Sequence, residues 1–218
     1  MSKLISLEDA VARIPDGASL LIGGFMAVGG PNRLVDELIR QRKSNLTIIA
    51  NDTARPNFGL GKLVVEKLVA KVVTSHIGLN PETQKQMIAG DIQVELVPQG
   101  TLAERIRSGG VGLGGVLTPT GVGTSVEEGK RTVEIDGKTY LLELPIKADF
   151  ALIAAKQADL YGNLTYALTA RNFNPIMALA GATVIAEAED IVPVGCIPPD
   201  AVMTPSVLVD HIVANTKR

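Results

Sequence analysis

The sequence predicts an α/β protein with an open, mostly parallel sheet, helices on both faces of that sheet and a β-hairpin insertion. Apolar runs rich in Val, Ile and Leu alternate with amphipathic stretches of about ten residues, which is the order expected of parallel strands and crossover helices. Aromatic residues make up only 3% of the chain and Trp is absent, so aliphatic side chains must form the core. Such a composition suits strands that are buried on both sides.

Each expected element follows from a local pattern. Ser6 followed by Asp9 predicts a capped helix that ends before Pro15. After Pro31, apolar residues at helical spacing lie opposite charged ones and predict a helix packed on the sheet. The same reasoning places strand 20–22, helix 31–40, strand 46–50, helix 63–68, strand 72–74, helix 81–89, strand 94–97, helix 102–107, strand 150–154, helix 175–180 and strand 183–186.

The middle of the chain departs from this alternation. Residues 108–129 are rich in Gly, Pro and Thr, and the apolar residues among them predict an ordered loop. The pair Asp136-Gly137 separates segments 132–135 and 138–142, which is a strong signal for a β-hairpin. The alternation then returns, and no repeat or low-complexity tail divides the chain. Residues 1–218 are therefore expected to form a single domain.

Charge, cysteine content and apolar runs exclude several classes of protein. The net charge is -2 and no basic cluster compensates for it, so nucleic acid is not an expected partner. The single Cys196 excludes an intramolecular disulfide framework and a cysteine-cluster zinc site, and no metal is expected. No apolar run has the length of a membrane span, and the first residues lack the pattern of a signal peptide. A cytoplasmic protein without a membrane partner is expected.

The loop between the first strand and the second helix is the strongest candidate for a ligand site. Glycine allows positive φ and removes the Cβ that would hold a ligand away, so main-chain N–H groups of this loop could bind an anionic or thioester-bearing ligand. A tight turn that needs glycine only for packing is the alternative. The spacing is not Gly-x-Gly-x-x-Gly, which disfavours a nicotinamide cofactor. The candidate binding residues are Gly23, Gly24, Phe25, Met26, Ala27, Val28 and Gly29.

Further candidates lie where predicted strands end, the edge at which open α/β sheets bind ligands. Asn51 and Thr53 follow one strand, and a helix cap or an Asx turn is the alternative for them. His76 follows the next strand, but no Gly-x-Ser-x-Gly motif supports a hydrolase, and His211 is expected to be structural. Gln99 carries a neutral amide that can stabilise an oxyanion or simply its own loop.

These motifs resemble the alpha subunits of the family I coenzyme A transferases, and in particular the bacterial acetate/acetoacetate or butyrate-acetoacetate type. The likeness starts with Asp16-Gly17, Gly23-Gly24-Phe25, Gly29 and Pro31 at a fixed spacing and covers nearly the whole chain. One departure is Ala27, whose methyl group is expected to be tolerated. The matching segments further along the chain are Asn51-Asp52-Thr53, Ser75-His76-Ile77-Gly78, Pro98-Gln99-Gly100-Thr101-Leu102, Thr118-Pro119-Thr120-Gly121-Val122-Gly123-Thr124, Glu127-Glu128-Gly129-Lys130 and Ala170-Arg171-Asn172-Phe173-Asn174.

The resemblance implies a function and a partner. In the family, a glutamate attacks an acyl-CoA to give an acyl anhydride, and the returning CoA forms a glutamyl-CoA thioester that delivers CoA to a second carboxylate, such as acetate, acetoacetate or butyrate. That glutamate typically precedes Asn-Gly on a beta subunit, and no glutamate precedes Asn-Gly here. The resemblance thus implies an alpha subunit of an α2β2 assembly, with CoA as a substrate, no tightly bound cofactor, and Gln99 facing the thioester. Glu127 and Glu128 are expected to form a solvated loop tip.

Two other functions remain open on the sequence. A non-catalytic sensor or binding module for a sugar phosphate can have a related α/β fold, and fold alone does not exclude it. A sugar-phosphate isomerase would need a base, which is not identified among the residues at the strand ends.

Overall fold

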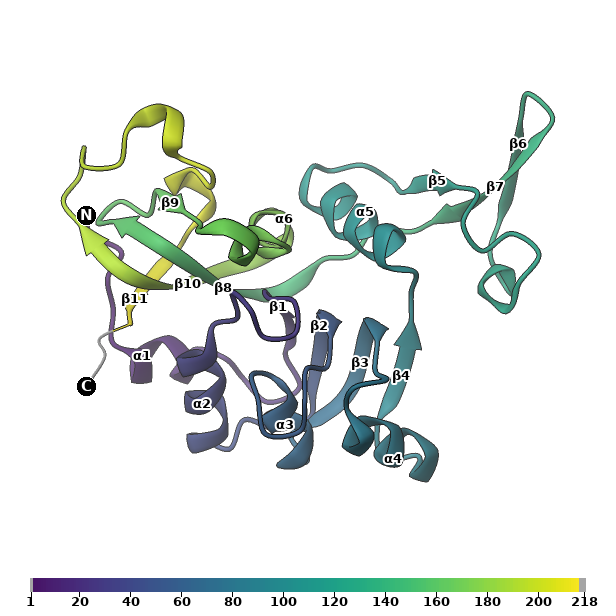
Figure 1. Cartoon of the computed structure of the whole chain (residues 1–218), viewed down its shortest axis with the longest axis horizontal. Coiled ribbons are helices and arrows are strands. Elements are labelled where there is room, and N and C mark those ends of the chain that lie inside the picture. Colours follow the sequence, from purple (N-terminus) through teal and green to yellow (C-terminus); the bar gives the residue numbers. More distant parts are fainter. Residues whose placement is uncertain (1, 216–218) are drawn as a thin grey trace.

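A computed structural model describes residues 2–215 of the chain and has the predicted open sheet at its centre (Figure 1). The sheet order is β11-β10-β8-β1-β2-β3-β4, and neighbours along this path are parallel, while β9 is antiparallel to β8. The predicted α/β class is therefore confirmed. The strands are β1 (Ser19–Ile22), β2 (Leu46–Asp52), β3 (Val69–His76), β4 (Gln93–Leu96), β8 (Ala148–Asp159), β9 (Leu164–Thr165), β10 (Gly181–Val192) and β11 (His211–Ala214).

Helices cover both faces of this sheet. On one face lie α1 (Leu7–Ala12), α2 (Asn32–Arg40), α3 (Gly61–Val65) and α4 (Pro81–Ala89), and on the other lie α5 (Gln99–Gly110) and α6 (Asn174–Ala180). Successive side chains of β1 alternate between the two layers: Leu20 and Ile22 pack with α1, α2 and α3, whereas Leu21 packs with α5 and α6. Both faces are apolar because every second residue of a strand points to the same side.

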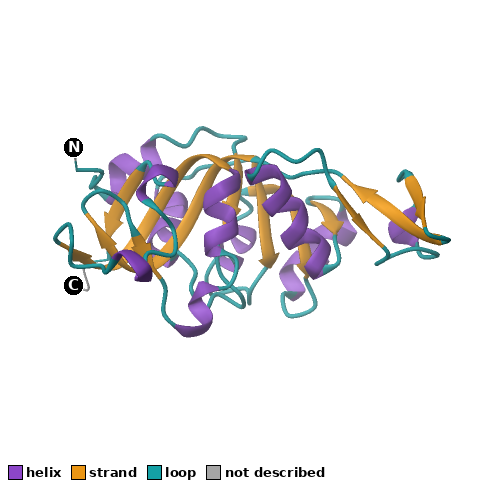
Figure 2. Cartoon of the chain, turned by 90° about the horizontal axis from the view of Figure 1, so that it is seen from above, coloured by secondary structure: helices purple, strands orange, loops and turns teal. Residues whose placement is uncertain are grey.

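The insertion forms an arm that extends beyond the edge strand β4 (Figures 1 and 2). It is an antiparallel sheet in the order β5-β7-β6, made of β5 (Val116–Thr118), β6 (Thr132–Ile135) and β7 (Lys138–Glu143). The predicted hairpin turn is present, with Asp136 at φ 50° and Gly137 at φ 73°. At the base of the arm, Glu143 is buried and accepts a 2.5 Å hydrogen bond from Nζ of Lys130.

The helix α5 differs from the sequence prediction, because it begins at Gln99 and continues to Gly110 instead of covering 102–107. Glycine disfavours helix, but the packing here requires it. A Cβ on Gly109 would lie 2.0 Å from the carbonyl oxygen of Ile146, and a Cβ on Gly110 would lie 2.3 Å from Cβ of Leu179. Tertiary contacts therefore override the low helix propensity of both residues.

Other predicted bounds were also short or shifted. The strands β3, β8 and β10 are longer than predicted, and α3 begins earlier than predicted. The short strands β9 and β11 were not predicted, and neither was β5, which lies in the segment 108–129 that was expected to be a loop. The structure also contains four short 3-10 helices that the sequence did not indicate: η1 (Ser125–Glu127), η2 (Leu168–Arg171), η3 (Pro199–Ala201) and η4 (Ser206–Leu208).

The order of the strands determines where a ligand can bind. From the central β1 the chain adds β2, β3 and β4 on one side, and it then returns through α5 and the arm to add β8 on the other side of β1. The connections that leave the carboxyl ends of β1 and β8 thus run in opposite directions. This divergence opens a crevice at the carboxyl edge of the sheet, next to the loop that follows β1.

Candidate active site

The glycine loop leaves the carboxyl end of β1 and packs against the first residue of α6. A Cβ on Gly23 would lie 1.8 Å from Oδ1 of Asn174, and a Cβ on Gly29 would lie 2.6 Å from the carbonyl oxygen of Ala170. Nδ2 of the fully buried Asn174 donates to the carbonyls of Gly29 and Ala170, and its Oδ1 accepts from the amide of Ala154. Packing alone therefore requires glycine at both ends of the loop.

Between these glycines, residues 25–28 form a tight two-residue turn. The amides and carbonyls of Phe25 and Val28 bond each other at 3.1 and 2.9 Å. The two central residues, Met26 at φ 50° and Ala27 at φ 63°, have the left-handed backbone of a type I′ turn. A side chain in this conformation costs about 1–2 kcal/mol per residue. The Ala27 methyl fits because Gly59 has no side chain, since a Cβ there would lie only 2.5 Å from Cβ of Ala27.

Three amides of the loop have no protein partner. Within residues 2–215, the N–H groups of Gly24, Ala27 and Gly29 make no hydrogen bond to the protein. Gly24 is buried, whereas Ala27 and Gly29 are partly exposed, so the N–H groups of Ala27 and Gly29 are the ones that can bind an anion or a polarised carbonyl oxygen.

A buried carboxylate holds this turn, and the sequence analysis did not single it out. Oδ2 of Asp52, the last residue of β2, accepts from the amide of Met26 at 2.8 Å, and its Oδ1 accepts from the amide of Ala54 at 2.7 Å. Asp52 is only 4% exposed. The signal that could have found it is its position between Asn51 and Thr53 at the end of a buried strand, where an acidic side chain must find N–H donors.

The structure brings two of the predicted site residues into direct contact. Nε2 of Gln99 donates a 2.6 Å hydrogen bond to Oδ1 of Asn51, and Nδ2 of Asn51 donates a 2.7 Å bond to Oδ2 of Asp52. The hydroxyl of Ser75 donates to the Asn51 carbonyl at 2.6 Å. Gln99 is the first residue of α5, it is exposed, and one N–H of its amide remains outside this network.

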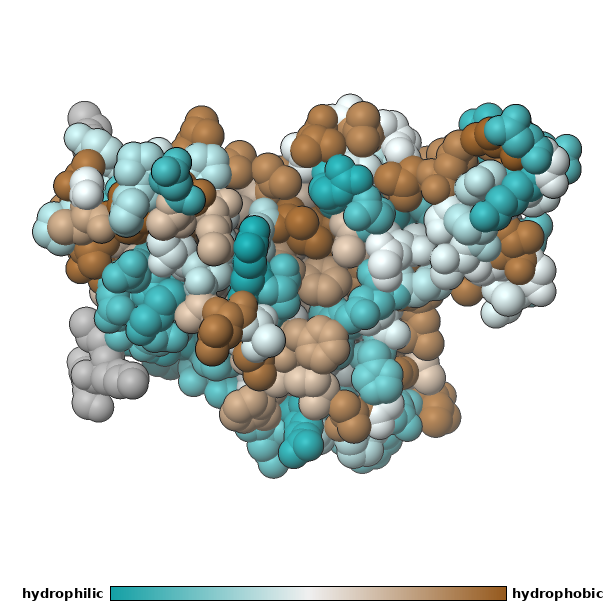
Figure 3. Space-filling view, turned by 45° about the horizontal axis from the view of Figure 1, so that its top comes forward, coloured by the Kyte–Doolittle hydropathy of each residue, from teal (hydrophilic) through white to brown (hydrophobic). Residues whose placement is uncertain are grey.

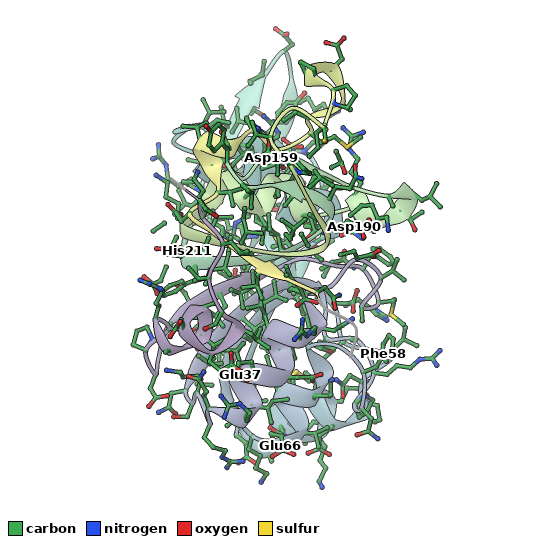
Figure 4. All side chains as sticks on the ribbon, turned by 90° about the vertical axis from the view of Figure 1, so that its left-hand side faces the viewer. Glu37, Phe58, Glu66, Asp159, Asp190 and His211 are labelled. Carbon is green, nitrogen blue, oxygen red and sulfur yellow. The ribbon has the colours of Figure 1, made fainter. Side chains whose placement is uncertain are left out.

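The other two candidates at the strand ends differ in accessibility. Thr53 is 1% exposed, and its carbonyl accepts from Nδ2 of Asn80, so it lies beneath the surface. His76 is exposed and neighbours Asp52 across the β2–β3 pair, and its ring packs against Gly78. His211 begins β11, the edge strand that is separated from β2 by three strands, and burial lowers the pKa of its imidazole. In Figure 4, His211 and Phe58 lie on opposite sides of the molecule.

A hollow of about 660 Å³ adjoins the loop and is lined by Met26, Arg55, Pro56, Asn57 and Phe58. Its walls are largely apolar, and Arg55 places a positive charge at them. A small carboxylate with a short apolar chain has matching chemistry.

A second cavity, of about 220 Å³, lies on the other side of the loop, between Gly29, Arg33 and Glu187. Glu187 is 3% exposed, and its Oε2 accepts the amides of Arg33 and Leu34 at 3.0 Å each. It therefore caps α2, whose own N-cap residue is Pro31. Burial raises the pKa of Glu187, and the two backbone hydrogen bonds oppose part of that rise.

The raised pKa of Glu187 predicts a pH dependence of stability. A group with a higher pKa in the folded state contributes most below its unfolded pKa of about 4.5, and the contribution is lost as pH rises through the folded pKa. The Glu187→Gln variant should therefore gain stability relative to the wild type as pH rises from 4 to 7, about the range where carboxyls titrate. Urea denaturation across this range measures the difference. The same curve for Glu189→Gln, whose carboxylate is exposed and paired with Lys156, is the control, and equal slopes for the two variants would contradict the prediction.

The part of the chain that the structure describes contains neither a metal-binding cluster nor a membrane-spanning helix. Among residues 2–215, no three or more His, Cys, Asp or Glu side chains are grouped so that they could hold a metal ion. None of the helices in that range has the length and apolar character needed to cross a bilayer.

Comparison with protein families connects this geometry to a chemistry. Residues 4–215 match the family described as Coenzyme A transferase, a match that includes the glycine loop, Asn51, Asp52 and Gln99. The chain belongs to the coenzyme A transferase family. The resemblance inferred from the glycine loop and the Pro98–Leu102 segment is thus confirmed.

Two curated relatives in the transferase family match over nearly their full length. Acetate CoA-transferase subunit alpha from Escherichia coli (strain K12) is 53% identical over 214 residues, which cover 98% of this chain and 97% of that protein. The alpha subunit of the acetoacetyl-CoA:acetate/butyrate CoA transferase from Clostridium acetobutylicum is 50% identical over 212 residues, which cover 97% of each chain. Both names describe one subunit of a larger enzyme.

Solved structures of transferases share the fold. An acyl-CoA transferase (YdiF) from E. coli O157:H7, in a thioester complex with CoA, superposes with a TM-score of 0.87 at 26% identity, over 98% of this chain. The match covers 47% of YdiF, so this chain spans about half the length of that protein. The decarboxylase AibA/AibB superposes with a TM-score of 0.81 at 33% identity, and the match covers 98% of this chain and 84% of that protein chain. The fold therefore also serves another reaction.

Proposed function

We propose that this chain is the alpha subunit of a cytoplasmic CoA-transferase. It exchanges CoA between a short-chain acyl-CoA and a carboxylate such as acetate, acetoacetate or butyrate. The reaction passes through a glutamyl-CoA thioester on a partner beta subunit. The observation that carries the proposal is the hydrogen-bonded chain that links Gln99 through Asn51 and Asp52 to the glycine loop in a member of this family.

In this mechanism the chain binds and polarises the thioester and does not attack it. The free amides of Ala27 and Gly29 and the free N–H of Gln99 are donors for an acyl carbonyl oxygen that becomes negative in the tetrahedral intermediate. The partner's glutamate forms the new C–O bond and the CoA thiolate leaves. That thiolate then attacks the glutamyl carbonyl of the anhydride and releases the acyl carboxylate. CoA is a substrate here, and no tightly bound cofactor takes part.

A partner must cover the loop for this chemistry to occur away from water. The names of the relatives imply a beta subunit. Large apolar side chains are exposed around the loop, with Phe25 45%, Val28 50%, Phe58 55% and Leu168 95% exposed. Asn172, which follows η2, donates to the Val28 carbonyl, so η2 lies beside the turn. Figure 3 shows apolar residues among polar ones on this face and along the arm. We propose that the beta subunit binds at this rim in an α2β2 assembly.

The proposal predicts that the purified chain transfers no CoA and that activity appears on co-expression with a beta subunit containing Glu-Asn-Gly. Incubation with acyl-CoA should then leave a hydroxylamine-sensitive thioester on the beta subunit, detected by intact-protein mass spectrometry.

The control is Glu128→Ala, in the exposed loop of the arm, which should leave turnover unchanged. Turnover by the chain alone that this variant abolishes would refute the proposal. Thermal stabilisation of the chain alone by sugar phosphates would instead favour a binding module.

A further inference from the structure

We propose that Asp52 is the positioning residue of this site, because its buried carboxylate holds both the Phe25–Val28 turn and the amide of Gln99 in their working geometry. The inference rests on the proposed function. It adds a residue that neither touches the thioester in the proposed mechanism nor was singled out by the sequence.

The first step concerns the hydrogen bonds that the Asp52 carboxylate accepts. Asp52 is 4% exposed and accepts three N–H groups at 2.7–2.8 Å: those of the Met26 and Ala54 backbone and of the Asn51 side chain. An ionised carboxylate accepts and never donates, and a buried one must be satisfied by donors of this kind. All three donors are drawn from the loop and the strand end that form the site.

The second step is the orientation of two amides. Because the Asp52 carboxylate can only accept hydrogen bonds, Asn51 must direct its own Nδ2 toward Asp52. The Oδ1 of Asn51 therefore points to Gln99. Gln99 must in turn present Nε2 to Asn51, which leaves its second N–H as the free donor. A chain of three side chains thus makes the direction of the Gln99 amide depend on the acceptor oxygen Oδ2 of Asp52.

The third step is the strain in the turn. Met26 and Ala27 both have left-handed backbones, which side chains disfavour. The bond from the Met26 amide to Asp52 runs from the turn to the rigid sheet, because Asp52 pairs with His76 across β2 and β3. Without this bond, the turn has a lower barrier to leaving the conformation that presents the amide of Ala27.

The test is a double-mutant cycle in the reconstituted enzyme, with turnover measured at saturating and limiting acyl-CoA. We expect Asp52→Ala to lower kcat about 100-fold with a smaller change in KM, since misplacement of positioned donors affects the transition state most. In the Gln99→Ala background the same substitution should have an effect smaller by about threefold or more. A role in folding alone would leave the two effects multiplicative, and that result would overturn the proposal.

Two further variants sharpen the result. Asp52→Asn can keep its oxygen toward Met26 and Asn51 and lose only the bond from Ala54, so kcat should recover most of the way to wild type. An asparagine variant as impaired as the alanine variant would overturn the hydrogen-bond account. Asp149→Ala is the matched control, because Asp149 likewise accepts a backbone amide and a side chain from one residue, Ser19, but at the amino edge of the sheet. It should lower stability and leave kcat unchanged.

A measurement without turnover separates this inference from the proposed function. In the wild-type chain, NMR should show slow hydrogen exchange of the Met26 amide and a resolved side-chain resonance of Gln99, and both should be lost in Asp52→Ala. If the wild-type complex transfers no CoA, the proposed function fails while this measurement still decides whether Asp52 orders the turn and the amide. Unchanged exchange and resonances in Asp52→Ala would refute it.

Discussion

Replacement of Gln99 by alanine is expected to lower kcat of the reconstituted transferase about 100-fold, the usual loss when one donor to an oxyanion is removed. The side chain is exposed at the start of α5, so its removal leaves no cavity in the core. The chain should therefore fold and assemble normally. Steady-state kinetics of CoA transfer, with Tm measured in parallel, distinguishes lost catalysis from lost structure.

Two variants serve as controls for this prediction. Gln93→Ala removes the same amide from an exposed position at the amino end of β4 and should have no effect on kcat. Gln99→Glu places a carboxylate against Oδ1 of Asn51, where two acceptors repel, and it should be at least as inactive as the alanine variant. A Gln99→Ala enzyme with wild-type kcat would remove Gln99 from the mechanism.

Substitution of Gly23 by alanine is expected to lower the free energy of unfolding by about 3 kcal/mol, the range for overpacking combined with lost buried hydrogen bonds. The new Cβ would lie 1.8 Å from Oδ1 of Asn174. Asn174 cannot move aside without breaking its bonds to Gly29, Ala170 and Ala154. Urea denaturation of the chain measures the loss.

The chain offers a glycine with the opposite expectation. A Cβ on Gly100 would meet nothing within 4 Å, and the residue lies in α5 without positive φ. Gly100→Ala should therefore raise the free energy of unfolding by about 0.5–1 kcal/mol. If the two substitutions changed stability equally, the packing explanation for Gly23 would be wrong.

The fold could be predicted well from sequence where a pattern is local. Continuous apolar runs and helical apolar patterns marked the strands and helices along the sheet, and Asp136-Gly137 marked the hairpin correctly. The failures are where the tertiary contacts decide. Gly109 and Gly110 are helical only because neighbouring segments pack against them, and β11 is a strand because the long β10 offers it an edge.

The positions of the candidate site residues were predicted in part. The sequence placed the glycine loop, Asn51, His76 and Gln99 at the carboxyl edge of the sheet, where the structure has them, since strand ends mark that edge. It did not show that Thr53 is enclosed, or that Asp52 accepts from Met26. Both observations depend on which side chains face the core at the end of β2. At a strand end the alternation of buried and exposed residues is irregular, so the sequence alone does not indicate which side chain faces inward.

The sequence by itself determined the fold class and the family, because apolar periodicity and the spacing of glycines are properties of consecutive residues. Only the tertiary structure decided which side chains meet at the site. Met26, Asp52 and Gln99 are separated by 26 and 47 positions, and they come together because β1 and β2 are adjacent while α5 returns over their carboxyl ends. Hydrogen bonds act over about 3 Å, so their pairing depends on the packing of distant segments and not on the order of residues in the chain.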